Sequence, residues 1–131
     1  MAEGQRRGLV GKGFFAFEAL EVYWLSVDFA YEVCKPVQRF PDSEKYALVS
    51  QLKRAATSVM LSNAEGRGRG SDKDLTKFLF WARDSLLETV SGFHLTERFK
   101  FVQRDQAEPI YTSANQLASK LAAFIKTLGG S

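Results

Sequence analysis

Apolar residues recur along residues 14–128 at alternating steps of three and four, which is the spacing of a helix face. Four such stretches follow one another, and no stretch of similar length has the period of two that a strand requires. An average step of 3.5 residues is typical of the seam in a left-handed helix bundle. We therefore expect an all-α protein, an antiparallel up-and-down four-helix bundle. The expected seams comprise Phe17, Leu20, Trp24, Val27, Tyr31 and Cys34; Val49, Leu52, Ala56, Val59 and Asn63; Leu75, Leu79, Ala82, Leu86, Thr89 and Phe93; and Ile110, Ala114, Leu117, Leu121, Phe124 and Leu128.

Proline, glycine and serine residues supply the signals that separate these helices. Pro36 is expected to end or kink the first helix because its ring clashes with the preceding turn. Gly66 is a candidate for the left-handed position that closes the second helix. Ser71, with Asp74 three residues later, resembles the capping box that begins a helix. The short linker between Gly66 and Ser71 predicts that the second and third helices are antiparallel.

A second apolar stripe accompanies the seam on the first and third helices. Val22 and Phe29 are seven residues apart, and so are Phe80 and Leu87. At about 100° per residue, each pair lies roughly half a turn from the expected seam. Either these helices are buried on both sides within the bundle, or the second stripe is covered by other copies of the chain. We favour an oligomer interface, because a four-helix bundle offers few positions that are buried on both sides.

Composition narrows the class of protein. The chain has 131 residues, which suits a single domain, and we expect a basic tail at residues 1–13 and one bundle domain at residues 14–131. The single cysteine excludes an intramolecular disulfide, and the single histidine excludes a two-histidine zinc motif. No metal or cofactor is expected. No apolar run approaches the roughly 18 residues of a membrane span, so we expect a cytoplasmic protein without a membrane partner.

The net charge of +3 is small, but the basic residues are unevenly distributed. Alternating glycine and arginine at residues 66–70 would let guanidinium groups and backbone amides approach phosphates closely. Five copies together would carry a charge of about +15, which favours a polyanionic partner. The alternative is that residues 66–70 form only a flexible turn and that the basic residues belong to an ordinary solvated surface. The candidate nucleic-acid-binding residues are Lys53, Arg54, Arg67, Arg69, Lys73, Lys77 and Arg83.

Two polar residues near the end of the second helix stand out. Asn63 falls on the expected seam, where a single asparagine often fixes register or oligomeric state. Glu65 lies in the last helical turn, where the helix dipole disfavours an anion, so we expect it to have a donor partner such as Arg67, Arg69 or Arg83. We interpret both residues as structural rather than catalytic, since no metal ligand or second acid accompanies Glu65.

An ordered set of short segments gives the chain a family resemblance. It resembles the four-helix-bundle proteins encoded in intervening sequences of bacterial 23S ribosomal RNA genes, whose relatives include the accessory variability determinant of diversity-generating retroelements. The matching segments are residues 17–22, 40–48, 51–59 and 64–66, followed by Ser71, Phe78, Leu79, Ala82, Arg83 and residues 85–88.

Three residues depart from the family pattern. Ser62 stands where the family usually has asparagine, Asn63 stands where it has an apolar residue, and Asp84 replaces a common glycine. With Glu65 and Gly66 of the family's Ala-Glu-Gly sequence, Ser62 and Asn63 form the candidate structural motif. These departures would alter interface detail or partner choice and leave the fold intact.

The resemblance implies a ring-like homopentamer without known enzymatic activity. Members of the retroelement branch of this family bind nucleic acid and a reverse transcriptase, so the resemblance makes such partners an expectation for this chain. We therefore expect a non-enzymatic homo-oligomer that binds RNA, DNA or a nucleic-acid-processing protein through its basic surface. The first alternative is a protein–protein scaffold. The second is an enzyme acting on a small molecule, although the sequence has no phosphate-loop motif, metal signature or nucleophile–base pair.

Overall fold

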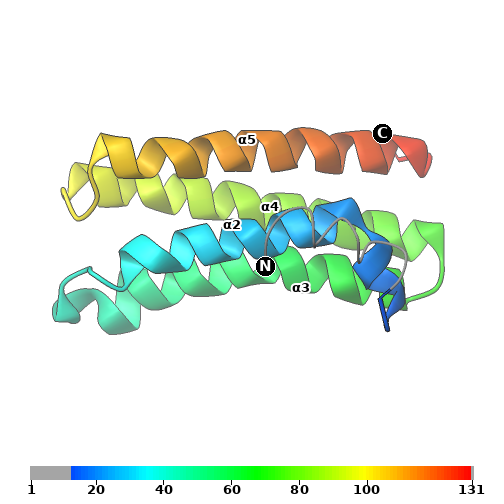
Figure 1. The fold of residues 1–131 in the computed structure, drawn as a ribbon, viewed down its shortest axis with the longest axis horizontal. Coiled ribbons are helices and arrows are strands. Elements are labelled where there is room, and N and C mark those ends of the chain that lie inside the picture. Colours follow the sequence, from blue (N-terminus) through cyan, green and yellow to red (C-terminus); the bar gives the residue numbers. More distant parts are fainter. Residues whose placement is uncertain (1–12, 131) are drawn as a thin grey trace.

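The computed structural model describes residues 13–130 and confirms the antiparallel four-helix bundle (Figure 1). The four helices run alternately up and down, and two short helical turns and one π-helical turn accompany them. All but residue 13 of the predicted tail lies outside the described part of the chain. The elements are a 3-10 helix, η1, at Ala16–Ala19; α2, Glu21–Val37; a 3-10 turn at Asp42–Glu44; a π-helical turn at Lys45–Val49; α3, Ser50–Gly68; α4, Asp72–Arg98; and α5, Arg104–Thr127.

Each helix packs against the next, and α5 closes the ring against α2. The packing is most extensive between α3 and α4 and least extensive between α2 and α5. The predicted seams of α3 and α4 are confirmed, because their members from Leu52 to Phe93 are buried. In α5 the buried stripe follows the prediction as far as Leu121 and then continues to Ile125, leaving Phe124 half-buried.

Small residues allow α3 and α4 to approach each other closely. A Cβ atom on Gly66 would lie 2.6 Å from the Phe78 Cβ, and one on Gly92 would lie 2.5 Å from the Leu52 Cδ2. Both distances are too short for a non-bonded carbon–carbon contact. The Phe78 Cβ is attached directly to the α4 backbone, so the helix spacing at that end depends on Gly66, whereas the Leu52 Cδ2 ends a flexible side chain that can move aside.

The turn between α3 and α4 is built differently from the sequence prediction. Gly66 lies inside α3, which continues to Gly68, and the left-handed backbone belongs to Gly70, with φ of +87°. The prediction that Gly66 closes the helix is therefore wrong; its missing side chain serves close packing instead. Ser71 is the N-cap as predicted, and its Oγ accepts a hydrogen bond of 3.2 Å from the Asp74 amide.

The inward face of α2 is the stripe that the sequence analysis assigned to an oligomer interface. Val22 is only 4% exposed and Phe29 only 1% exposed, and both lie in the hydrophobic core with Val33 and Val37. Their assignment to contacts between copies is therefore wrong. Ser26 lies on the same stripe, so in the sequence this stripe is the more polar of the two apolar stripes on α2.

The other stripe of α2 faces outward and is partly covered by η1. The Trp24 Nε1 donates a 2.9 Å hydrogen bond to the Glu18 carbonyl, and the Phe17 ring packs edge-on against Tyr23 at 4.8 Å. Tyr31, further along this stripe, is 64% exposed. Trp24 and Tyr31 are therefore not seam residues, and the predicted seam of the first helix lies on the wrong side.

Candidate nucleic-acid interface

The seven predicted basic residues lie in three separate places. Arg67 and Arg69 are at the end of α3, and Lys73 and Lys77 are in the first turns of α4. Because the α3–α4 turn joins them, these four exposed cations gather at one end of the bundle. None of the four forms an ion pair with any residue that the structure describes.

Lys53 and Arg54 are exposed but distant from this group. They lie in the first turn of α3, about 20 Å along the helix from Arg67. No ion pair within residues 13–130 involves either side chain. They form a second, smaller basic site at the opposite end of α3.

Arg83 has a third environment. Its guanidinium lies 4.9 Å from the Phe80 ring centroid and 3.6 Å from the Asp84 carboxylate, and its Nε is buried without a hydrogen-bond partner. It lines an open cavity of about 440 Å³ between α4 and α5, together with Phe80, Ala122, Ile125, Lys126 and Gly130. Arg83 therefore lies toward α5 and does not extend the four-cation group at the α3–α4 turn.

Aromatic rings adjoin two of the four cations, Arg69 and Lys77. The Arg69 Cζ lies 5.1 Å from the Phe78 ring centroid, and the Lys77 Nζ lies 5.1 Å from the Trp81 ring centroid. The Phe78 and Trp81 rings meet edge-to-face at 4.8 Å and 71°. We call Arg67, Arg69, Lys73, Lys77, Phe78 and Trp81 the basic–aromatic surface.

Sequence reasoning did not single out Trp81. The signal was present, because Trp81 follows Lys77 by one helical turn and falls beside the seam position Ala82 rather than on it. The sequence pattern placed Trp24, Tyr31 and Phe93 on the predicted seams, which argued against a stacking role for them.

The structural motif in α3 divides into buried and exposed members. Asn63 is fully buried, and its Nδ2 donates to the Ser26 Oγ at 2.7 Å, while its Oδ1 has no partner. Ser62 is half-buried, and Gly66 makes the contact with Phe78 described above. Glu65 is exposed and makes no ion pair or hydrogen bond with any described residue, so the predicted donor partner is not found.

The outward side of α4 retains exposed apolar residues. Leu87 is 54% exposed, Leu95 is 47% exposed, and Phe80 is half-buried beside the α4–α5 cavity. Phe80 and Leu87 therefore remain candidates for contacts between copies, in contrast to Val22 and Phe29. Leu95 is an addition that the sequence analysis did not make.

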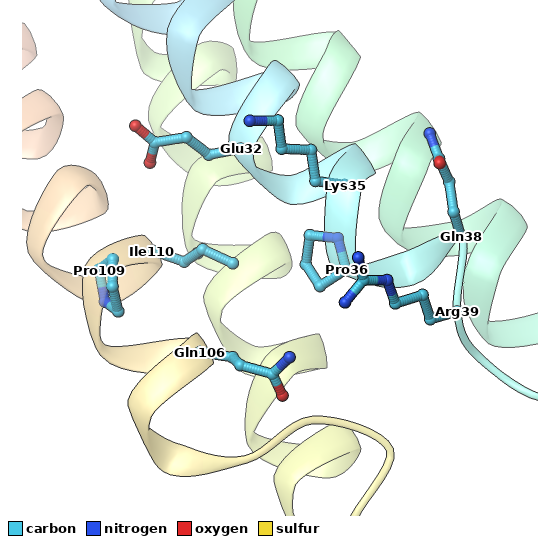
Figure 2. A pocket seen from close by; sticks show the side chains of 8 residues that line it. All are labelled: Glu32, Lys35, Pro36, Gln38, Arg39, Gln106, Pro109 and Ile110. Atoms are coloured by element: carbon cyan, nitrogen blue, oxygen red, sulfur yellow. The ribbon is translucent and has the colours of Figure 1, made fainter.

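A wider opening of about 530 Å³ lies between the end of α2 and the start of α5 (Figure 2). Arg39 and Gln106 extend into it from opposite sides, and Pro109 and Ile110 line the α5 side with Gln106 (Figure 2). Glu32, at its edge, accepts a 2.9 Å hydrogen bond from the Ser113 hydroxyl, and the Lys35 ammonium lies over the Tyr31 ring. No residue lining this opening is a cysteine, serine or histidine that could act as a nucleophile–base pair.

A polar cluster joins the end of α4 to the start of α5. The Tyr111 hydroxyl donates to Glu97 at 2.7 Å, and Arg104 contacts the same carboxylate at 3.2 Å. The Tyr111 hydrogen bond, and to a smaller extent Arg104, lower the pKa of Glu97 against the opposing effect of desolvation. Burial, and then Glu97, raise the pKa of Tyr111. Each polar group of the cluster has a partner within it, so we interpret the cluster as a clamp that holds α4 against α5.

Two kinds of feature are absent from residues 13–130. No three histidine, cysteine, aspartate or glutamate side chains are grouped closely enough to hold a metal ion. None of the helices in this range combines the length and hydropathy needed to cross a membrane.

Comparison with known proteins gives a family and a fold. Residues 18–123 match the family described as 23S rRNA-intervening sequence protein. A crystal structure of a protein of unknown function from the S23 ribosomal protein family of Bacteroides thetaiotaomicron superimposes with a TM-score of 0.74. The two sequences are 24% identical over 80% of this chain and 95% of the other, so this likeness establishes the fold alone. No curated protein matches the chain.

Proposed function

Because the chain belongs to the 23S rRNA-intervening sequence protein family, we propose that it is a non-enzymatic, homo-oligomeric bundle that binds nucleic acid, or a nucleoprotein partner, through basic residues. One observation carries the proposal: Arg67, Arg69, Lys73 and Lys77 meet at the α3–α4 turn, exposed and without ion pairs among the described residues. A cation that is not already neutralised can release the counterions of a phosphate backbone.

Lys53 and Arg54 extend the proposed surface as a second contact point. A ligand reaching both ends of α3 would span about 20 Å, which corresponds to several nucleotides. Arg83 is left out of the proposal, because its guanidinium is already engaged by Phe80 and Asp84.

The oligomeric part of the proposal is supported by the exposed apolar residues of α4. Phe80, Leu87 and Leu95 are the candidates for contacts between copies, and the family resemblance favours a pentamer. Assembly matters for binding, since five copies of a chain with net charge +3 carry about +15. A cytoplasmic location is part of the same proposal.

A salt series tests this function. Labelled single-stranded and duplex RNA and DNA are titrated with the full chain, and fluorescence anisotropy gives the affinity at each salt concentration. We expect the logarithm of the affinity on duplex DNA to fall with the logarithm of salt by about 0.9 per phosphate contact. Absence of binding at low salt would overturn the proposal.

The alternative function is a protein–protein scaffold without a nucleic-acid role. The exposed Leu87 and Leu95 favour it, because apolar surface on a small domain is typical of a docking site. A defined protein partner that stays bound after nuclease digestion, together with no retention of RNA or DNA, would favour the scaffold.

A further inference from the structure

Trp81 is the more exposed of the two tryptophans in the bundle. Its side chain is 45% exposed, and its indole Nε1 donates no hydrogen bond to any residue in the described range. Trp24, by contrast, is half-buried and donates to the Glu18 carbonyl. An indole left at the surface is typical of a position where the ring contacts a ligand or partner.

Packing against Phe78 fixes the orientation of the Trp81 ring. Phe78 is nearly buried and meets the indole edge-to-face at 4.8 Å, while its own Cβ lies against Gly66. The ring therefore packs beside a close contact between α3 and α4. A ring packed against a buried neighbour loses less conformational freedom than a freely exposed one when another flat group stacks on it.

Cations flank this aromatic pair on both sides. Lys77 lies over the Trp81 ring, and Arg69 lies over the Phe78 ring, each at 5.1 Å. Lys73 is one helical turn before Lys77 on the same face of α4. Aromatic rings interleaved with unpaired cations suit a ligand that alternates flat apolar groups with negative charges.

Trp81 also lies on a different side of α4 from Phe80 and Leu87, about 100° and about 120° around the helix axis, whereas Leu95 lies about 40° from it. It shares a stripe with Phe78, three residues before it, and Ser85, four residues after it, and both face α3. Phe80 instead lines the cavity against α5. Assembly through Phe80 and ligand binding at Trp81 therefore do not compete for the same surface.

We propose that Trp81 is a stacking platform for an unpaired base of single-stranded nucleic acid, with Arg69, Lys73 and Lys77 contacting the adjoining phosphates. The inference rests on the proposed function and adds the kind of nucleic acid that the surface prefers. Every base has a π-face, so such stacking tolerates many sequences, whereas a duplex keeps those faces covered within its own stack. The platform therefore selects single strands over duplexes without reading sequence.

The fluorescence of Trp81 tests the stacking directly. In a Trp24→Phe variant, Trp81 is the only tryptophan, because the chain has two. We expect a 15-nucleotide oligo(U) or oligo(dT) to quench its emission, the two strands distinguishing RNA from DNA. An abasic strand of equal length and charge is the control and should bind more weakly with little quenching. Equal quenching by the abasic strand would overturn stacking.

Substitutions at Trp81 supply the second test. Trp81→Leu keeps an apolar side chain but removes the π-face, and should weaken single-strand binding by about 5-fold or more while leaving duplex binding unchanged. Trp81→Phe should restore most of the loss, since phenylalanine also stacks. Circular dichroism confirms that each variant retains its helices.

The outcomes separate this inference from the proposed function. If Trp81→Leu binds single strands as tightly as the wild type while charge reversal of Lys73 and Lys77 abolishes binding, the platform is refuted and the function stands. If the wild type binds no nucleic acid, both are refuted. If Trp81→Leu lowers the solution mass, the ring lies between copies, and the platform is refuted.

Discussion

Gly66 of α3 and Phe78 of α4 are in contact, with room for a hydrogen atom but not for a methyl group between them. A Cβ on Gly66 would lie 2.6 Å from the Phe78 Cβ and 3.2 Å from the Leu75 Cδ1. Since Phe78 in turn orients Trp81, this backbone-to-ring contact links the spacing of two helices to the basic–aromatic surface. The glycine is therefore a structural requirement of the surface as well as of the core.

Gly66→Ala should destabilise the bundle. The added methyl group must displace Phe78 or separate α3 from α4, at a cost of about 1–3 kcal/mol in the free energy of unfolding. Gly68→Ala is the matched control, because it lies in the same helix with nothing within 4 Å of its would-be Cβ. The control should be neutral or gain up to about 1 kcal/mol from helix propensity. Equal denaturation midpoints for the two variants would contradict the contact.

The buried Asn63 and Ser26 should depend on each other. Ser26→Ala leaves the Asn63 amide with only the Val22 carbonyl, at 3.4 Å, and should cost about 1–3 kcal/mol. In an Asn63→Ala background the same change should cost much less, because no buried donor is then abandoned. A double-mutant cycle by urea denaturation measures this coupling. Additive effects would show that the pair does not couple α2 to α3.

Acid should weaken the clamp between α4 and α5. The pKa of Glu97 is lowered in the folded chain by Tyr111 and then Arg104, so its contribution to stability is present above the pKa of an unfolded glutamate, about 4.3. That contribution disappears as the pH falls through the lower folded pKa. Tyr111→Phe should therefore lose less stability than the wild type between pH 6 and pH 3. Tyr31→Phe is the control, because that exposed phenol makes no hydrogen bond with the described residues. Parallel pH profiles for all three proteins would argue against the clamp.

Leu87→Asp should lower the mass of the assembly in solution. A charge placed in a contact between copies is desolvated without a partner, whereas on a free surface it costs little. Phe80→Asp should act in the same direction, and Tyr31→Asp, on the outer face of α2, should leave the mass unchanged. Light scattering measures the mass, and circular dichroism checks the helices. An unchanged mass for both α4 variants, or a monomeric wild type, would remove the oligomer from the account.

Phe29→Asp is expected to behave differently. Phe29 is 1% exposed within its own chain, so the aspartate would have to be buried in the core rather than at an interface. This variant should lose helical signal altogether, whereas Leu87→Asp should retain it. The comparison separates core residues from candidate interface residues on the two apolar stripes.

The sequence was sufficient for the helix count, the antiparallel order and the buried faces of α3 and α4, because the predicted seam is the longer apolar stripe on each of those helices. It was insufficient for α2, where the longer stripe in the sequence is the outward one. The inward stripe contains Ser26, whose hydroxyl donates to the Val22 carbonyl at 2.6 Å. The outward stripe contains the large aromatic residues Trp24 and Tyr31, so the sequence pattern alone favours it as the buried face. Only the position of η1 and of the neighbouring helices decides which stripe is inside.

The candidate surface was predictable in part for a similar reason. Arg67, Arg69, Lys73 and Lys77 are close in sequence on either side of a short turn, so their proximity follows from local structure. Arg83 follows them in sequence but lies toward α5, which depends on how α4 is rotated in the bundle. Trp81 was missed because its exposure is a property of the packed α3–α4 pair.

Charge reversal at the α3–α4 turn tests the central claim most directly. Lys73→Glu with Lys77→Glu removes two cations of the basic–aromatic surface, and Arg98→Glu with Lys100→Glu makes the same change in net charge at the far end of α4. Anisotropy with labelled single-stranded RNA at low salt compares both with the wild type. We predict that the first pair binds about 10-fold more weakly or worse, with a shallower salt dependence, and that the second pair, at the end of α4 nearer to Lys53 and Arg54, loses much less. Equal affinities for the two double variants would contradict a nucleic-acid surface at this turn.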